Sequence, residues 1–183
     1  MTVWELRNAD VDNFAMLVLP DSDEHVNVDK QFGGDGAPLK WRKARSLEVF
    51  VEKRRKKPKP RADVSTFLPG SLVLNERARV ALADFLGQFG QLLELDVEGA
   101  REYFYNVTNV IRCVDVERSQ KYPEGTVARE VFREAEIPAT AAVFKDPSTA
   151  PVRIYVNAAA KNMLDAMIQG AGLSGLEMAP VGV

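Results

Sequence analysis

The chain has 183 residues, 46% of them hydrophobic, and a formal net charge of −2 at neutral pH. This length supports one substantial hydrophobic core, whereas two domains would each be small and marginally stable. Cys113 and His25 are the single cysteine and histidine, so an internal disulfide is excluded and a zinc site would need mostly carboxylate ligands. We therefore expect one domain without metal or cofactor, in which Cys113, set among apolar residues, is a buried and inert thiol.

The sequence carries no sign of export or of membrane insertion. No basic start is followed by an apolar run, and no later run approaches the length that crosses a bilayer. We therefore expect a soluble protein of the cytoplasm that has no membrane partner.

The N-terminal third predicts short strands separated by loops. Apolar and β-branched residues favour strands at residues 3–7, 14–19 and 46–51. The polar residues between the first two strands form a hairpin or a short loop. Residues 21–40 are rich in loop formers, and their Gly33–Gly36 run lacks the Gly-Lys-Ser/Thr ending of a phosphate loop. We interpret that run as a flexible turn.

Charge is strongly polarised in this part of the chain. Residues 40–61 contain eleven Lys or Arg against two Glu, a local balance of +9 that leaves −11 for the remainder. The basic stretch, residues 53–61, also contains prolines, which together with charge repulsion predicts an extended, solvated connection. Clustered cations suit nucleic-acid phosphates, but no aromatic residue interrupts the run to stack on bases. A nucleic-acid-associated binding module that uses this stretch is therefore the alternative function.

Acidic side chains precede the basic stretch. They are Asp10, Asp12, Asp21, Asp23, Glu24, Asp29 and Asp35. A concentration of carboxylates steers a basic partner, although an ordinary solvated surface has the same composition. We take as candidate partner-binding residues Asp21, Asp23, Glu24, Asp29 and Asp35.

Two amphipathic helices are predicted in the C-terminal part. Asn75 caps the first, which runs to about Phe89 before Gly90, with the apolar face Ala78, Leu82, Phe85, Leu86 and Phe89. Asn157 caps the second, which ends at Gly170 or Gly172, with the apolar face Ala160, Met163, Leu164, Met167, Ile168 and Ala171. We expect both faces to be buried under a sheet, and an exposed partner groove is the alternative for the Met and Leu stripe.

The remaining segments complete an α+β pattern. Strand formers occupy residues 91–97, 103–116, 139–144 and 152–156. Residues 127–136 are ambiguous, because their apolar residues recur every four positions while arginines also alternate with valine. The predicted fold is a single α+β domain with an antiparallel-rich sheet and two amphipathic helices.

Polar residues interrupt the predicted strand at residues 103–116. Its branched residues suit a half-buried sheet, so Asn106, Thr108 and Asn109 lie in or beside that sheet and need hydrogen-bond partners. They form either a polar bend that shapes the fold or a binding site.

The sequence offers no catalytic constellation. No Asp or Glu stands two residues before a Lys, no Gly-x-Ser-x-Gly elbow occurs, and with His25 alone in a polar loop no serine or cysteine nucleophile has a suitable base. Two carboxylate pairs would share a strand face, where exposure explains them better than acid–base or metal chemistry: Glu94 with Asp96, and Asp115 with Glu117. We predict no enzyme, and no catalytic, cofactor-binding or metal-binding residue.

Motifs spread along the C-terminal part give a resemblance to a known family. They are Asn106-Val107-Thr108-Asn109-Val110 with Asp115 and Ser119, Gly70 with Ser71-Leu72-Val73-Leu74, Val143-Phe144-Lys145, Tyr155-Val156, and Gly172-Leu173-Ser174-Gly175-Leu176-Glu177. In order and spacing they resemble immunity protein family eleven of bacterial polymorphic toxin systems. The resemblance covers residues 63–183, whereas residues 1–62 form a variable part that matches only at Trp4 and in general character.

This resemblance implies a non-catalytic immunity protein that binds a cognate bacterial toxin and neutralises it. Binding that occludes the toxin site, or that holds the toxin in an inactive state, is sufficient for protection, and complementary charge speeds capture. The residues by themselves agree with a binding protein and leave open whether it forms homo-oligomers.

Overall fold

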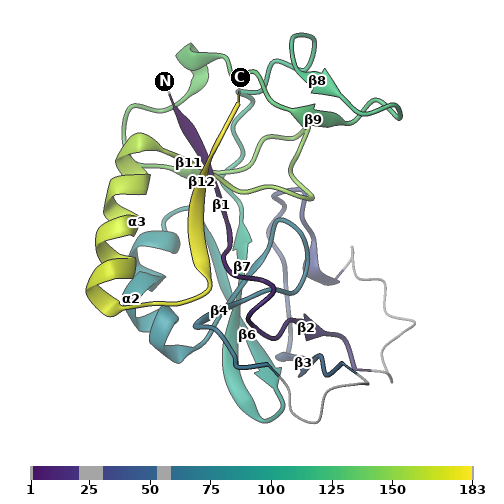
Figure 1. Ribbon diagram of the computed structural model, residues 1–183, viewed down its shortest axis with the longest axis vertical. Coiled ribbons are helices and arrows are strands. Elements are labelled where there is room, and N and C mark those ends of the chain that lie inside the picture. The colour runs from purple at the N-terminus through teal and green to yellow at the C-terminus, as the bar shows by residue number, and fades with distance from the viewer. Residues whose placement is uncertain (1, 21–30, 53–58, 183) are drawn as a thin grey trace.

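A six-stranded sheet forms one part of the computed structural model, which describes residues 2–20, 31–52 and 59–182 (Figure 1). Its strand order is β2-β3-β6-β7-β5-β4, and every pair is antiparallel except β3 with β6. The strands are β2 (Leu17–Val18), β3 (Arg45–Val49), β4 (Val64–Ser65), β5 (Leu72–Leu74), β6 (Gly90–Val97) and β7 (Ala100–Val107).

This sheet nearly closes on itself. The backbone N–H of Leu17 donates to Thr66 O at 2.7 Å and that of Ala15 donates to Pro60 O at 2.9 Å, so β2 lies against the segment that flanks β4. Apolar side chains pack together on its enclosed face: Leu17, Phe32, Leu47, Phe67, Val73, Leu95, Val97 and Phe104. Near closure shields strand edges that would otherwise pair with other chains.

A second sheet joins the two ends of the chain. Its order is β10-β11-β1-β12, with every pair antiparallel, and its strands are β10 (Val143–Phe144), β11 (Tyr155–Asn157), β1 (Val3–Asn8) and β12 (Leu176–Val181). Val3 in β1 lies opposite both Asn157 and Val181. The N-terminal strand is therefore held between two C-terminal strands.

A separate hairpin projects from the end of the structure that carries both termini (Figure 1). It consists of β8 (Gln120–Lys121) and β9 (Val127–Arg129), and the short 3-10 turn η2 (Glu134–Glu136) follows.

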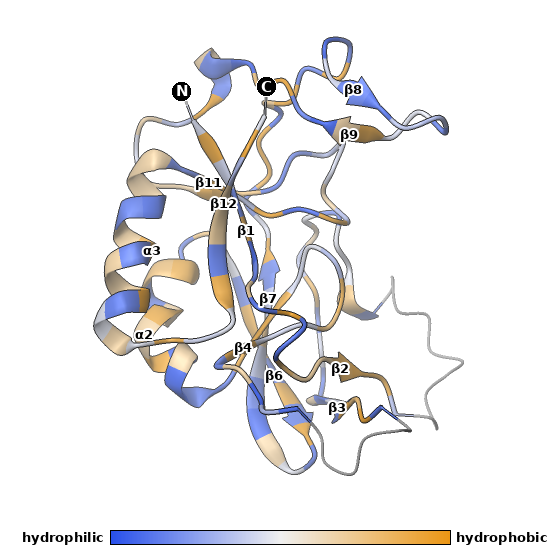
Figure 2. Ribbon diagram, in the orientation of Figure 1, coloured by the Kyte–Doolittle hydropathy of each residue, from blue (hydrophilic) through white to orange (hydrophobic). Residues whose placement is uncertain are grey.

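Two helices lie side by side on one side of the sheets (Figure 1). They are α2 (Glu76–Leu86) and α3 (Ala158–Ala171), each capped by an asparagine side chain that accepts a hydrogen bond from a first-turn N–H. Apolar and polar residues alternate along both (Figure 2). The buried residues belong to the main core: Ala78, Leu82, Phe85, Leu86, Ala160 and Leu164.

The predicted α+β class is confirmed, with two amphipathic helices and mostly antiparallel sheets in a single domain. Leu164 is fully buried, as predicted, but Met163 is wrongly assigned to the core, because it is 43% exposed on the flank of α3. Helix α2 ends at Leu86 rather than near Phe89, and Gly90 begins β6. No helix in the described ranges is both long and apolar enough to cross a membrane.

Several predicted strands have different bounds. The strand predicted at 103–116 is β7, which begins at Ala100 and ends at Val107; beyond it only isolated bridges form at Val110 and Val114. The chain bends there because the N–H groups of Thr108 and Asn109 both donate to Phe89 O, each at 3.0 Å. Strands β1 and β2 belong to different sheets, so they form no hairpin.

Two further segments differ from expectation. Residues 127–136 contain both a strand, β9, and the turn η2, so neither single interpretation holds. The end of the basic stretch is not a solvated connection: Arg61 is half-buried and its guanidinium contacts the buried Glu102 carboxylate at 2.7 Å. Residues 53–58 of that stretch lie outside the described residues.

Candidate protein-interaction face

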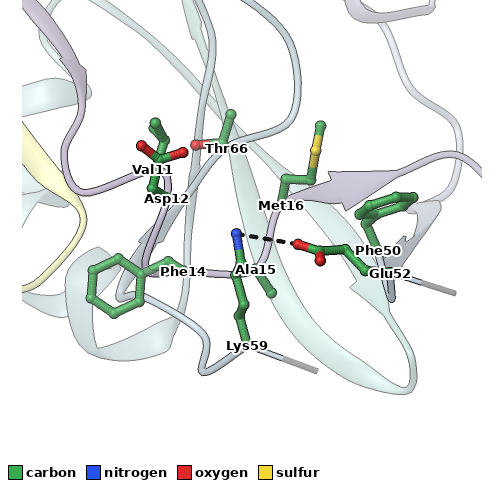
Figure 3. A pocket seen from close by; sticks show the side chains of 9 residues that line it. All are labelled: Val11, Asp12, Phe14, Ala15, Met16, Phe50, Glu52, Lys59 and Thr66. Carbon is green, nitrogen blue, oxygen red and sulfur yellow. Dashed lines mark ion pairs between the residues drawn. The ribbon is translucent and has the colours of Figure 1, made fainter. Parts of the chain in front are cut away.

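Exposed apolar side chains gather around two adjoining hollows. Within the described residues, Val11, Met16, Phe50 and Val152 are large hydrophobic residues that face solvent. The first three line a hollow of about 280 Å3 (Figure 3). A second hollow, of about 410 Å3, shares Val11, Met16 and Thr66 with the first and extends to Val152. We call the two together the apolar groove.

Different local features place Val11, Met16 and Phe50 on this face. Met16 lies between the buried Ala15 and Leu17 in extended chain and remains 41% exposed. Met16 O accepts a hydrogen bond from the Phe50 N–H at 2.9 Å, which places the Phe50 side chain, 46% exposed, beside it. A turn at Asp10, whose φ is +51°, carries Val11 to the same face.

Charged groups stand at the mouth of the first hollow. The Lys59 ammonium points across it toward the Glu52 carboxylate, with 3.5 Å between the two (Figure 3). Asp12 and the Thr66 hydroxyl also line it. An apolar centre with a polar rim is the usual anatomy of a surface that binds another protein.

Of the five predicted partner-binding residues, the structure describes Asp35. Asp21, Asp23, Glu24 and Asp29 lie outside the described residues. Asp35 is exposed and its carboxylate accepts the Ala37 N–H at 2.9 Å, so it shapes a local turn and does not line the groove. Sequence reasoning missed the groove residues, because residues 14–19 are all apolar and no alternation marks the outward side of that predicted strand.

Lys145 lines another hollow, but its ammonium is fully engaged. The side chain is buried, and Nζ donates to the carbonyl oxygens of Gly34 and Gly70 at 3.0 Å and of Ala150 at 2.8 Å. Burial lowers the pKa of Lys145 to about 8, and the nearby Asp35 carboxylate opposes that shift. All three protons are used, so Lys145 joins loops and offers no donor to a ligand.

The polar residues of the sequence motifs have structural roles. The Asn106 amide donates to Ala37 O at 2.9 Å, and that of Asn109 donates to Val143 O at 2.9 Å. Ser174 donates through both its N–H and its hydroxyl to the Asp63 carboxylate, at 2.9 Å each. These bonds favour the interpretation of the 106–109 segment as a polar bend.

The titratable residues that sequence analysis weighed for catalysis have the following surroundings. The described residues contain no group of three or more His, Cys, Asp or Glu side chains placed to hold a metal ion. Cys113 is fully buried, and burial, with the nearby Asp146 carboxylate, raises the pKa of its thiol to about 12. Glu94 pairs with Arg101 at 3.3 Å, and Asp96 accepts the Gly99 N–H at 2.7 Å. His25 lies outside the described residues.

No protein-family model matches the chain, and no curated protein matches it significantly. The resemblance to immunity protein family eleven therefore stays a proposal.

Proposed function

We propose that this chain is a non-catalytic immunity protein that binds a bacterial toxin through the apolar groove and neutralises it in the cytoplasm. The observation that carries the proposal is the gathering of exposed Val11, Met16, Phe50 and Val152 around one groove with a charged rim. Contiguous apolar surface with a polar rim is typical of a site that another protein covers. The resemblance to the immunity family supports a toxin as that protein.

The groove offers enough apolar surface to contribute to affinity. Burying a whole Met or Phe side chain stabilises by about 1.5 to 3 kcal/mol. Met16 and Phe50 expose 41% and 46% of their surface, so a partner that covers them gains roughly half of that from each. The Asp12 carboxylate and the Lys59–Glu52 pair then restrict which polar groups fit beside them.

Co-expression with the domain encoded by the neighbouring gene tests this function. We expect that domain alone to arrest growth, and this chain to restore growth while co-purifying with it. Met16→Asp should abolish both effects, because it places a charge in the apolar centre of the interface. The matched control is Val80→Asp, which changes a valine that is 73% exposed on α2, outside the groove.

Two outcomes would contradict the proposal. Growth restored without any complex would exclude direct inhibition and favour an enzyme that protects the target. Equal loss of protection by Met16→Asp and Val80→Asp would remove the groove from the interface.

A further inference from the structure

The β8–β9 hairpin projects from the body of the molecule (Figure 1). Figure 1 shows it standing away from both sheets, on the side opposite to the helices. Its residues 120–126 are all exposed, whereas Val127, where β9 begins, is buried. A convex element of this kind fits a concave partner surface, in contrast to the apolar groove.

The hairpin tip is ordered by its own hydrogen bonds. The Gly125 N–H donates to Tyr122 O and the Tyr122 N–H donates to Thr126 O, each at 2.9 Å. Pro123 at the second position of this turn fixes its backbone, and Gly125 adopts a φ of +92° that a side chain would strain. The Thr126 hydroxyl also donates to the Glu124 carboxylate at 2.9 Å. The turn displays the Tyr122 side chain, 52% exposed, at small entropic cost.

The base of the hairpin is anchored by buried polar groups. The Ser119 hydroxyl donates to Asp115 O at 2.6 Å and accepts the Val131 N–H at 3.0 Å. Glu130 is fully buried and accepts from the Tyr155 hydroxyl at 2.6 Å and from Arg153 at 2.9 Å. These bonds fix the direction of the hairpin relative to β11.

The second Arg153 nitrogen donates to Ala128 O at 3.1 Å, inside β9 itself. The Ser119 hydroxyl bonds to Asp115 O and to the Val131 N–H lie at the base of the hairpin. The motif residues Asp115 and Ser119 therefore position the hairpin and not the groove. Their contacts give this motif a role that binding at the groove does not require.

We propose that the β8–β9 hairpin is a preorganised finger that inserts Tyr122 into a concave cleft of the partner toxin, an inference that rests on the proposed function. Tyrosine is among the residues that dominate binding energy at protein interfaces, because it combines a large apolar ring with a hydroxyl. The cleft has apolar walls around the ring and a polar group within reach of the phenol.

The charge of the tip favours a protein over a nucleic acid as its partner. Lys121 and Glu124 flank Tyr122, so the tip carries both signs of charge. A surface that stacks on bases combines its aromatic residue with a uniformly positive groove, which this tip lacks.

Binding of purified Tyr122 variants to the catalytically inactivated domain of the neighbouring gene tests the finger. We expect Tyr122→Ala to raise Kd about tenfold or more, mainly through faster dissociation, with an unchanged urea midpoint. Tyr122→Phe keeps the ring and should raise Kd by less than Tyr122→Ala. The difference in Kd between Tyr122→Phe and the wild type measures the contribution of the hydroxyl to binding. Val80→Asp is again the control for an unrelated surface change.

The outcomes separate this inference from the proposed function. If Tyr122→Ala binds like the wild type while Met16→Asp binds weakly, the finger is wrong and the groove remains the interface. If the wild type forms no complex, the proposed function fails and the finger fails with it. If both variants weaken binding, their effects on binding free energy should add, because Tyr122 follows β8 and Met16 precedes β2, and these two strands lie far apart (Figure 1). Loss of RNA or DNA binding in Tyr122→Ala, without loss of the protein complex, would also overturn the finger.

Discussion

Lys145 shows how one buried side chain joins segments that are distant in sequence. Its ammonium holds the carbonyls of Gly34, Gly70 and Ala150, which belong to three different loops. Gly70 is required at its position, because its φ is +64° and a Cβ would lie 2.7 Å from the backbone of Val152. Removing the ammonium leaves three acceptors without their donor, and a buried unsatisfied polar group costs about 1 to 3 kcal/mol.

Lys145→Met should therefore lower the free energy of unfolding by about 3 to 5 kcal/mol, which urea denaturation measures. The matched control is Lys161→Met. Lys161 lies on α3 and pairs with Asp165, which is one helical turn further along the same helix. That change should cost less than about 1 kcal/mol. Equal costs for the two variants would show that the three carbonyl contacts contribute nothing special.

The pKa of Lys145 can be tested by measuring the free energy of unfolding of the wild type and of Lys145→Met as a function of pH. Its pKa in the folded state is about 8, below the ordinary value of 10.5, so the unfolded chain binds more protons between these values. The stability of the wild type therefore rises with pH in that window relative to Lys145→Met. If the difference in unfolding free energy between the wild type and Lys145→Met instead shrinks above pH 8, the carbonyl contacts raise the pKa of Lys145 by more than burial lowers it.

Among the helices and strands, the sequence predicted those features that depend on contacts between residues close together in the chain. Both helix starts follow from Asn75 and Asn157, whose side chains accept the N–H three residues on, within the same turn. The end of β7 did not follow, because the bend depends on the distant Phe89 carbonyl. Strand β12 was missed for the same reason, since it is defined by pairing with β1 across the whole chain.

The apolar groove illustrates the same limit for the candidate site. It combines Val11 and Met16 with Phe50 and with Val152, which no sequence spacing relates. Single exposed hydrophobic residues are common on surfaces, so each alone predicts nothing. Contacts between distant segments bring the groove residues together: the Phe50 N–H donates to Met16 O, and the Leu17 N–H donates to Thr66 O.

Helix α3 provides the prediction at this scale. Leu164 is fully buried in the main core and Ile168 packs against the same core. Leu164→Ala should lower the free energy of unfolding by about 2 to 5 kcal/mol and Ile168→Ala by less, because the second site can relax into solvent. Met163→Ala, at a site that is 43% exposed, should leave the urea midpoint nearly unchanged. An unchanged midpoint for Leu164→Ala combined with weaker toxin binding would instead identify this helix face as a partner groove.

For the whole molecule, the distribution of charge bears on the choice between a protein and a nucleic-acid partner. Residues 40–61 carry a local balance of +9 on a chain whose net charge is −2. Part of that charge is already paired, since Lys59 pairs with Glu52 at the mouth of the groove and Arg61 pairs with the buried Glu102 carboxylate. Lys40, Arg42 and Lys43 are exposed and have no ion pair within the described ranges. Their unpaired positive charge is the observation that favours a nucleic-acid partner.

The aromatic residue beside those cations is not free to stack on a base. The Trp41 indole N–H donates to Gln31 O at 2.7 Å, and its ring packs edge-on against Phe32 with 5.4 Å between the centroids. Binding to nucleic acid would therefore rest on phosphate contacts alone, which are weak and independent of sequence at physiological salt.

A filter-binding titration with DNA and RNA tests this conclusion. We expect the wild type to bind neither more tightly than about 1 µM at physiological salt, the usual limit for nonspecific contacts. Neutralising Lys53, Arg54, Arg55, Lys56 and Lys57 should leave the urea midpoint unchanged, because a solvated run contributes little to a core. Sub-micromolar, salt-dependent binding that disappears in this variant would make the basic stretch a nucleic-acid site and displace toxin neutralisation as the leading function.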